Sequence, residues 1–170
     1  MEKITTLKSI ALSGFFAAII AVCSLIAVPS PVPFTLQVLA VFLTAGLLPF
    51  GSAFAAILIY ILLGVAGMPV FSGFTGGVSA LLGPTGGFIL SFLAVPFIFV
   101  AFGKNRMYAK MVISLIVFYT FGSLWYMQYT SANSFIAVLT VTVLPFIVPD
   151  IIKMVIAAII IKRLKGRVVF

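Results

Sequence analysis

The stretch SIALSGFFAAIIAVCSLIAV, residues 9–28, opens a run of 95 residues, Ser9 to Gly103, without one charged side chain. A second uncharged run of 39 residues extends from Met111 to Pro149. Of the 170 residues 64% are apolar and 7% are charged, against roughly 45–50% and about 25% in ordinary soluble domains. A soluble fold of this size still exposes about 30% of its unfolded surface, so it cannot bury so much apolar area. The chain is therefore predicted to be an all-α integral membrane protein.

Turn-forming residues divide the uncharged runs into lengths that suit spanning helices, which need about 20 apolar residues each. Breaks fall at the prolines of residues 29–33, at residues 48–52 and in a glycine-rich loop over residues 67–86. We expect one transmembrane domain, residues 1–170, with six spans: 8–28, 34–48, 52–66, 87–103, 111–129 and 150–164. The second and third spans are short, so we expect them to be tilted or extended into the neighbouring loops.

The basic residues predict how these spans are oriented. Nine of the ten gather at the N-terminus, between the fourth and fifth spans, and at the C-terminus: Lys3, Lys8, Lys104, Arg106, Lys110, Lys162, Arg163, Lys165 and Arg167. With six spans all three places face one side, and the positive-inside rule makes that side, with both termini, cytoplasmic. Orientation and contact with anionic membrane lipid then explain the net charge of +8, and no nucleic-acid partner is expected.

Two unusual features fall on the opposite, outer side. Gln37 opens an apolar span, where an unpaired amide is costly, so we expect either a capping or interhelical hydrogen bond or a water-lined cavity. The glycine-rich loop carries Met68, Phe71 and Phe74 and no charge, unlike a solvated flexible loop. Because non-helical backbone at membrane depth is tolerated only when buried in protein or lining a cavity, the loop is predicted to cover something apolar.

Asp150 and Lys153 are the only charged residues outside the basic clusters and the terminal Glu2. Three positions apart, they share a face of the last helix. In one interpretation Asp150 only caps that helix, while Lys153 pairs with it or reaches the membrane interface. In the other, ionisable groups at membrane depth mark a binding site. The uncharged loop on the same side favours the binding site.

The residue counts exclude several classes of protein. The chain has no His and one Cys, Cys23, so it holds no disulfide framework and no His-based zinc site, and neither a metal nor a cofactor is expected. One acid within the spans is too few for general acid–base chemistry, so the chain is not expected to be an enzyme. A structural membrane protein fits the composition but leaves Asp150 and Lys153 unexplained.

Four motifs, in order and at matching spacing, resemble the BioY family, the biotin-binding substrate (S) components of energy-coupling factor (ECF) vitamin transporters. They are VPFTLQ (residues 32–37), YILLG with GMPVF (60–64 and 67–71), LGPTGGF (82–88) and Pro145-Phe146 with Asp150 and Lys153. Two positions depart from the family pattern. Pro149 stands where Gly is usual, which leaves the entry to the last helix open, and Phe88 stands where Tyr is usual, which removes a hydroxyl.

The resemblance implies six helices around an outward-facing pocket and high-affinity biotin uptake across the cytoplasmic membrane of a prokaryote. It also implies docking on a transmembrane coupling subunit that carries two ABC ATPases. Small residues of the first helix stand at the docking positions: Ser13, Gly14, Ala17 and Ala18. An S component for another small vitamin, or a transporter that works alone, is the alternative.

Biotin has an apolar bicycle and valeryl chain, a ureido group and one carboxylate. For a ligand with these groups, our hypothesis is that the pocket is formed by Thr35, Gln37, Phe71, Phe74, Gly83, Thr85, Asp150 and Lys153. Aromatic residues of the glycine-rich loop are expected to cover the apolar parts, and Asp150 to accept a hydrogen bond from a ureido N–H. Lys153 either meets the carboxylate or holds Asp150 ionised, and the sequence leaves both roles open.

Overall fold

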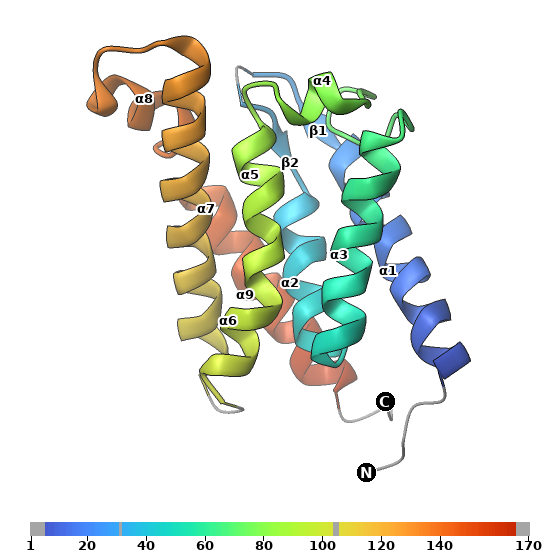
Figure 1. Cartoon of the computed structure of the whole chain (residues 1–170). Coiled ribbons are helices and arrows are strands. Elements are labelled where there is room, and N and C mark those ends of the chain that lie inside the picture. Colours follow the sequence, from blue (N-terminus) through green and yellow to red (C-terminus); the bar gives the residue numbers. More distant parts are fainter. Residues whose placement is uncertain (1–5, 31, 104–105, 166–170) are drawn as a thin grey trace.

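The computed structural model describes residues 6–30, 32–103 and 106–165, which form an almost wholly helical bundle (Figure 1). Its elements are α1 (Thr6–Leu25), β1 (Ala27–Val28), β2 (Phe34–Thr35), α2 (Gln37–Leu47), α3 (Phe50–Val65), α4 (Val78–Leu81), α5 (Gly86–Ser91), the 3₁₀-helix η1 (Phe92–Ala94), α6 (Val95–Ala101), α7 (Met107–Thr130), α8 (Phe135–Thr142) and α9 (Ile147–Leu164). The start of α1, the junction of α6 with α7 and the end of α9 lie at the lower end of Figure 1.

A short β-hairpin stands where the second span was expected to begin. Ala27 pairs with Thr35 and Val28 with Phe34 in an antiparallel register, and the Leu36 amide donates to the Ile26 carbonyl at 3.3 Å. Helix α2 therefore begins at Gln37, three residues after the approximate start of the expected span 34–48, because residues 34 and 35 pair as a strand. The first span likewise ends at Leu25 instead of residue 28.

The fourth span is one nearly continuous helical segment, Gly86–Ala101, with a short 3₁₀ stretch at Phe92–Ala94. Pro96 has no amide hydrogen to donate to the carbonyl four residues earlier, that of Phe92. Local tightening to 3₁₀ geometry is the expected response. The glycine-rich loop before this segment contains the one-turn helix α4 and an isolated bridge between Phe71 and Thr75.

The last span is preceded by a second, shorter helix at an angle. The axes of α8 and α9 differ by 48° across the turn that contains Pro145. Helix α9 begins at Ile147, three residues before the expected start, so Pro149 lies in its first turn. A proline is tolerated there because the first amides of a helix have no intrahelical acceptor. Asp150 is a first-turn acid and not the N-cap, which is Phe146.

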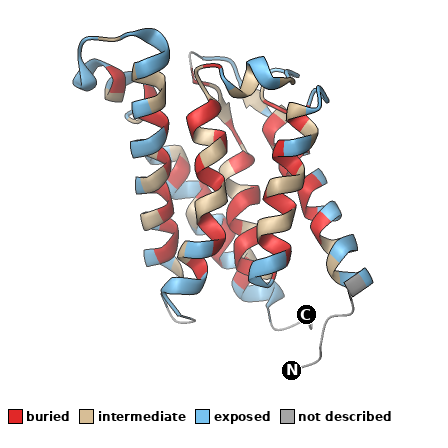
Figure 2. Cartoon of the chain, viewed as in Figure 1, coloured by how far each residue is buried: buried red, intermediate tan, exposed pale blue. Residues whose placement is uncertain are grey.

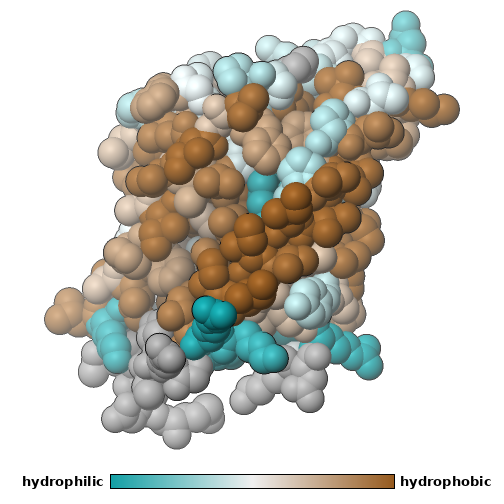
Figure 3. All heavy atoms as spheres, turned by 180° about the vertical axis from the view of Figure 1, so that it is seen from behind, coloured by the Kyte–Doolittle hydropathy of each residue, from teal (hydrophilic) through white to brown (hydrophobic). Residues whose placement is uncertain are grey.

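Length and apolar composition agree with a membrane bundle. Leu7–Leu25 and Met107–Thr130 are long enough to cross a bilayer, and α8 with α9 adds a bent crossing if the pair acts as one span. Three shorter apolar segments accompany them: Gln37–Leu47, Phe50–Val65 and Gly86–Ala101. Figure 3 shows a broad hydrophobic band with hydrophilic side chains gathered below it. The full count of six crossings stays a prediction.

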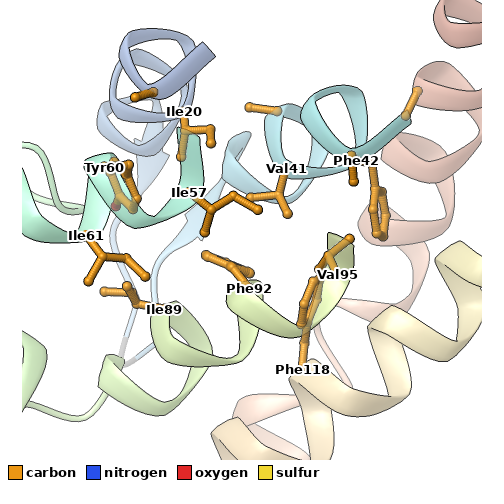
Figure 4. Close-up of a cluster of buried hydrophobic side chains, with 14 of the residues drawn as sticks. Ile20, Val41, Phe42, Ile57, Tyr60, Ile61, Ile89, Phe92, Val95 and Phe118 are labelled. Carbon is orange, nitrogen blue, oxygen red and sulfur yellow. The ribbon is translucent and has the colours of Figure 1, made fainter. Parts of the chain in front are cut away.

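Buried residues occupy the inward faces of the helices (Figure 2), and the centre of the core is drawn from α1, α2, α3, α5–α6 and α7 (Figure 4). Tyr60 and Phe42 are among its largest fully buried side chains. Glycines permit two close contacts. A Cβ on Gly64 would lie 2.0 Å from the ring of Phe71, and one on Gly46 would lie 2.3 Å from Ile161 Cδ1. Phe71 thereby ties the glycine-rich loop to α3.

One member of the basic clusters has a structural role. Lys110 is buried, and its Nζ donates to the Phe99 carbonyl at 2.6 Å. A cation at the last carbonyls of α6 complements the helix dipole, so Lys110 joins α7 to α6. Lys8, Arg163 and Lys165 are exposed. Lys3, Lys104 and Arg167, like Glu2, lie outside the described residues.

Candidate ligand-binding site

A cavity lies between α2, α5, α7 and the start of α9, under the loops at one end of the bundle. Its empty volume is about 640 Å³ when the open mouth is included. Its lining combines aromatic and aliphatic side chains with eight that carry a polar or charged group: Val32, Pro33, Thr35, Gln37, Val38, Ser72, Thr85, Phe88, Ile89, Phe92, Phe118, Tyr119, Thr142, Phe146, Asp150 and Lys153.

The charged wall of the cavity comes from one turn of α9. Asp150 and Lys153 are 3% and 4% exposed, and Lys153 Nζ lies 2.8 Å from Asp150 Oδ1. Tyr119 of α7 donates its hydroxyl to Asp150 Oδ2 at 2.8 Å. The ammonium also lies 4.0 Å from the centre of the Phe34 ring, a cation–π contact. Each carboxylate oxygen thus has a donor, and opposite charges compensate each other in a buried place.

Aromatic stacking brings the hairpin to this wall. The rings of Phe34 and Phe146 are 6.4 Å apart and 22° from parallel. Phe146 lies in the bend between α8 and α9, so the bend directs both an aromatic ring and Asp150 into the cavity. Thr142, at the end of α8, shares a 2.8 Å hydrogen bond with Ser123 of α7. This bond joins the end of α8, just before the bend, to α7.

Gln37 forms the polar contact on the α2 side. Its Nε2 donates to the hydroxyl of Tyr60 at 2.8 Å, and its backbone amide donates to Thr35 Oγ1 at 3.3 Å. Both structural alternatives raised by the sequence therefore apply: the side chain makes an interhelical hydrogen bond and also lines the cavity. That bond uses one of the two N–H donors of the amide.

The residues expected in the pocket divide into two sets. Five line the cavity: Thr35, Gln37, Thr85, Asp150 and Lys153. Phe71, Phe74 and Gly83 are not part of the lining. Phe71 packs edge-on against Tyr60 with ring centres 5.6 Å apart, Phe74 is 69% exposed, and the Gly83 carbonyl accepts from Trp125 Nε1 at 2.9 Å. The contacts of Phe71 and Gly83 join the loop to α3 and α7.

The small residues of α1 face two directions. Ser13 and Ala17 are buried; Ser13 Oγ donates to the Ser52 carbonyl of α3 at 3.1 Å. Gly14 and Ala18 are exposed, and nothing lies within 4 Å of a Cβ built on Gly14. The inward pair packs α1 on α3, and the outward pair leaves a shallow strip on the surface.

The chain matches the family model described as "BioY family" over residues 1–169. The chain belongs to the BioY family. Among its relatives, the "Probable biotin transporter BioY" of Pyrococcus horikoshii is 41% identical over 161 residues, 94% of this chain and 97% of that protein. The "Biotin transporter BioY" of Thermotoga maritima is 37% identical over 159 residues, 90% of this chain and 93% of that protein. The resemblance inferred from the four motifs is confirmed.

The fold of this BioY protein also matches a solved structure. The crystal structure of "the S-component for biotin from an ECF-type ABC transporter" superposes with a TM-score of 0.85 at 25% sequence identity, over 98% of this chain and 95% of that one. The predicted S-component fold is confirmed, and the chain is a member of a transporter family.

Several lining residues were absent from the sequence-based assignment. Tyr119 could have been predicted from the sequence, because a tyrosine in the middle of an uncharged span needs a hydrogen-bond partner for its hydroxyl. Phe92, Phe118 and Thr142 carried no such signal, since apolar residues and threonines are common in every span. Phe88, noted for its departure from the BioY pattern, does line the cavity.

Proposed function

We propose that this BioY protein is the substrate-binding component of an ECF-type ABC transporter and binds biotin in the cavity between α2, α7 and α9. The observation that carries the proposal is the hydrogen-bonded group of Asp150, Lys153 and Tyr119 in a cavity that four phenylalanines also line. The names of its relatives and of the matching solved structure support biotin as the ligand.

The chemistry of the wall suits the fused rings of biotin. Asp150 is an acceptor, so it binds a ureido N–H with one of the lone pairs that Lys153 and Tyr119 leave unused. Phe88, Phe92 and Phe146 supply the apolar surface for the bicycle. In this arrangement Lys153 keeps Asp150 charged and in place, which is the second of the two roles open from the sequence.

The bundle is proposed to cross the cytoplasmic membrane of a prokaryote six times, with both termini inside. Exposed basic residues lie at the start of α1 (Lys8) and at the end of α9 (Arg163) and beyond it (Lys165), and both helix ends are at the lower end of Figure 1. This placement supports the orientation through the positive-inside rule. The strip of Gly14 and Ala18 on α1 is proposed to meet a transmembrane coupling subunit that carries two ABC ATPases, because small residues let helices approach closely.

Calorimetric titration of the purified protein in detergent with biotin, riboflavin and thiamine tests the ligand. Saturable binding of biotin alone is expected. Binding of another vitamin in place of biotin would support the alternative S component, and binding of none would contradict the proposal. Uptake of labelled biotin by cells with and without the coupling module then distinguishes an ECF component from a transporter that works alone.

A further inference from the structure

One buried hydroxyl in the cavity wall has no partner. Among the described residues, Ser72 Oγ is the only buried side-chain oxygen or nitrogen that makes no hydrogen bond, and Ser72 lines the cavity. A buried hydroxyl without a partner is unfavourable, and nearly all such groups in folded proteins are satisfied. An acceptor that enters the cavity would remove this cost.

The backbone that carries Ser72 is held in a closed turn. The next two residues, Gly73 and Phe74, have φ angles of 73° and 59° and turn the chain back sharply. Phe71 and Thr75 close the turn with amide–carbonyl bonds of 3.0 and 3.3 Å, and Thr75 Oγ1 donates to the Ser72 carbonyl at 3.0 Å. With Phe71 packed over Gly64, Ser72 lies at the tip of a braced turn.

A second hydroxyl residue of the cavity lining, Thr85, does not form the capping hydrogen bond expected at its position. Thr85 occupies the N-cap position of α5 and lines the cavity, yet its side chain makes no capping hydrogen bond. Threonine at an N-cap normally accepts from an amide of the first turn. The glycine-rich loop and the start of α5 thus each contribute a hydroxyl-bearing residue to the lining of the cavity.

The charged pair is poorly suited to a ligand carboxylate. Lys153 Nζ is 2.8 Å from Asp150 Oδ1 and 4.0 Å from the Phe34 ring centre, so its charge is already compensated. A second carboxylate beside Asp150 would meet like charge in a place of low dielectric, where repulsion is strong. In Figure 1 the loop between α3 and α4 lies at the upper end of the bundle, while α9 runs through its middle and lower parts.

From these observations we propose that the hydroxyls of Ser72 and Thr85 bind the carboxylate of the ligand, while Asp150 binds its ureido end. The inference rests on the proposed function, because it assumes a ligand with a ureido group at one end and a carboxylate at the other. It makes Ser72 a specificity residue: the site distinguishes the acid from its neutral ester through this loop.

Biotin and biotin methyl ester, titrated into the same protein variants, test the assignment. Removing one hydroxyl, as Ser72→Ala or Thr85→Val, is expected to weaken biotin binding about tenfold, equivalent to about 1.4 kcal/mol, because a bond to an ionised acceptor is lost. The ester is expected to change by less than about twofold, so the ester-to-biotin ratio of dissociation constants falls. Ser79→Ala, an exposed serine of the same loop, is the control and leaves both affinities unchanged.

The other outcomes separate the two proposals. Equal losses for biotin and ester in Ser72→Ala would show a purely structural role and overturn this inference alone. The same follows if neither affinity changes, or if the unaltered protein binds the ester as tightly as biotin. An unaltered protein that binds neither compound would overturn the proposed function together with this inference.

Discussion

Asp150 illustrates how a single carboxyl group can be accommodated inside a membrane bundle. Lys153 and Tyr119 each donate to one of its oxygens at 2.8 Å. The lysine is an i+3 neighbour on α9, whereas the tyrosine comes from α7, 31 positions away in sequence. The carboxylate is thus oriented by two helices, and its direction depends on how they pack.

Tyr119→Phe is expected to weaken biotin binding about 3- to 10-fold, since a hydrogen bond that orients a charged group is lost. Calorimetric titration measures the change. Tyr129→Phe removes an exposed hydroxyl from the same helix and is the control, with affinity unchanged. Unaltered binding by Tyr119→Phe would show that Asp150 needs no support from α7.

Lys153→Ala is expected to lower the free energy of unfolding by about 3–5 kcal/mol, because it leaves the Asp150 carboxylate buried without a countercharge. The double substitution Asp150→Leu with Lys153→Met is expected to recover most of that stability and to bind no biotin. Thermal unfolding in detergent measures the first effect and titration the second. A single Lys153→Ala variant as stable as the unaltered protein would contradict the account of the pair.

At the scale of the elements, long apolar runs predicted the main helices well, because a backbone in lipid must satisfy its hydrogen bonds internally. The β1–β2 hairpin was not predicted, because Pro29 and Pro33 indicate only that the first helix ends and do not show that the flanking residues pair as strands. The angle between α8 and α9 was not predicted, since residues 134–148 are uncharged and mostly apolar and their periodicity does not show where a helix stops. The site depends on both features, through Phe34 and Phe146.

The outward strip of α1 leads to a prediction about transport. Gly14→Leu is expected to leave biotin binding within about twofold, because nothing lies within 4 Å of the added Cβ, and to reduce uptake at least about tenfold by blocking close helix approach. Titration and uptake of labelled biotin by cells that contain the coupling module measure the two effects. Gly51→Leu, on α3 with equally free surroundings, is the control; equal uptake by both variants would exclude this strip as the docking surface.

At the scale of the whole molecule, the scarcity of charge was the most informative feature. It predicted a membrane bundle, and it singled out Asp150 and Lys153, which do meet in the cavity. Of the aromatic lining, position 88 was expected in the pocket from the resemblance. Phe92, Phe118 and Phe146 were not predicted, because they come from separate elements and sequence does not show which faces converge. Phe71 and Phe74 were expected to form pocket walls. In the fold Phe71 packs on Tyr60 instead, and Phe74 is exposed.

The orientation of the bundle is testable with single cysteines in a Cys23→Ala background. Asn133→Cys lies in the exposed turn after α7, and Arg163→Cys lies in the last turn of α9. A membrane-impermeant thiol reagent applied to intact cells is expected to label the first and not the second, because the positive-inside rule places the α9 end in the cytoplasm. Labelling of Arg163→Cys alone would show that the orientation is opposite to the proposed one.

The central claim is that biotin binds at Asp150, and equilibrium titration of Asp150→Asn against the unaltered protein tests it most directly. The side chains have nearly the same shape, so a matching thermal unfolding curve serves as the control for folding. The account predicts a loss of biotin affinity of roughly 30-fold or more, since a charged acceptor is removed from a buried contact. A folded Asp150→Asn protein that binds biotin as tightly as the unaltered one would contradict it.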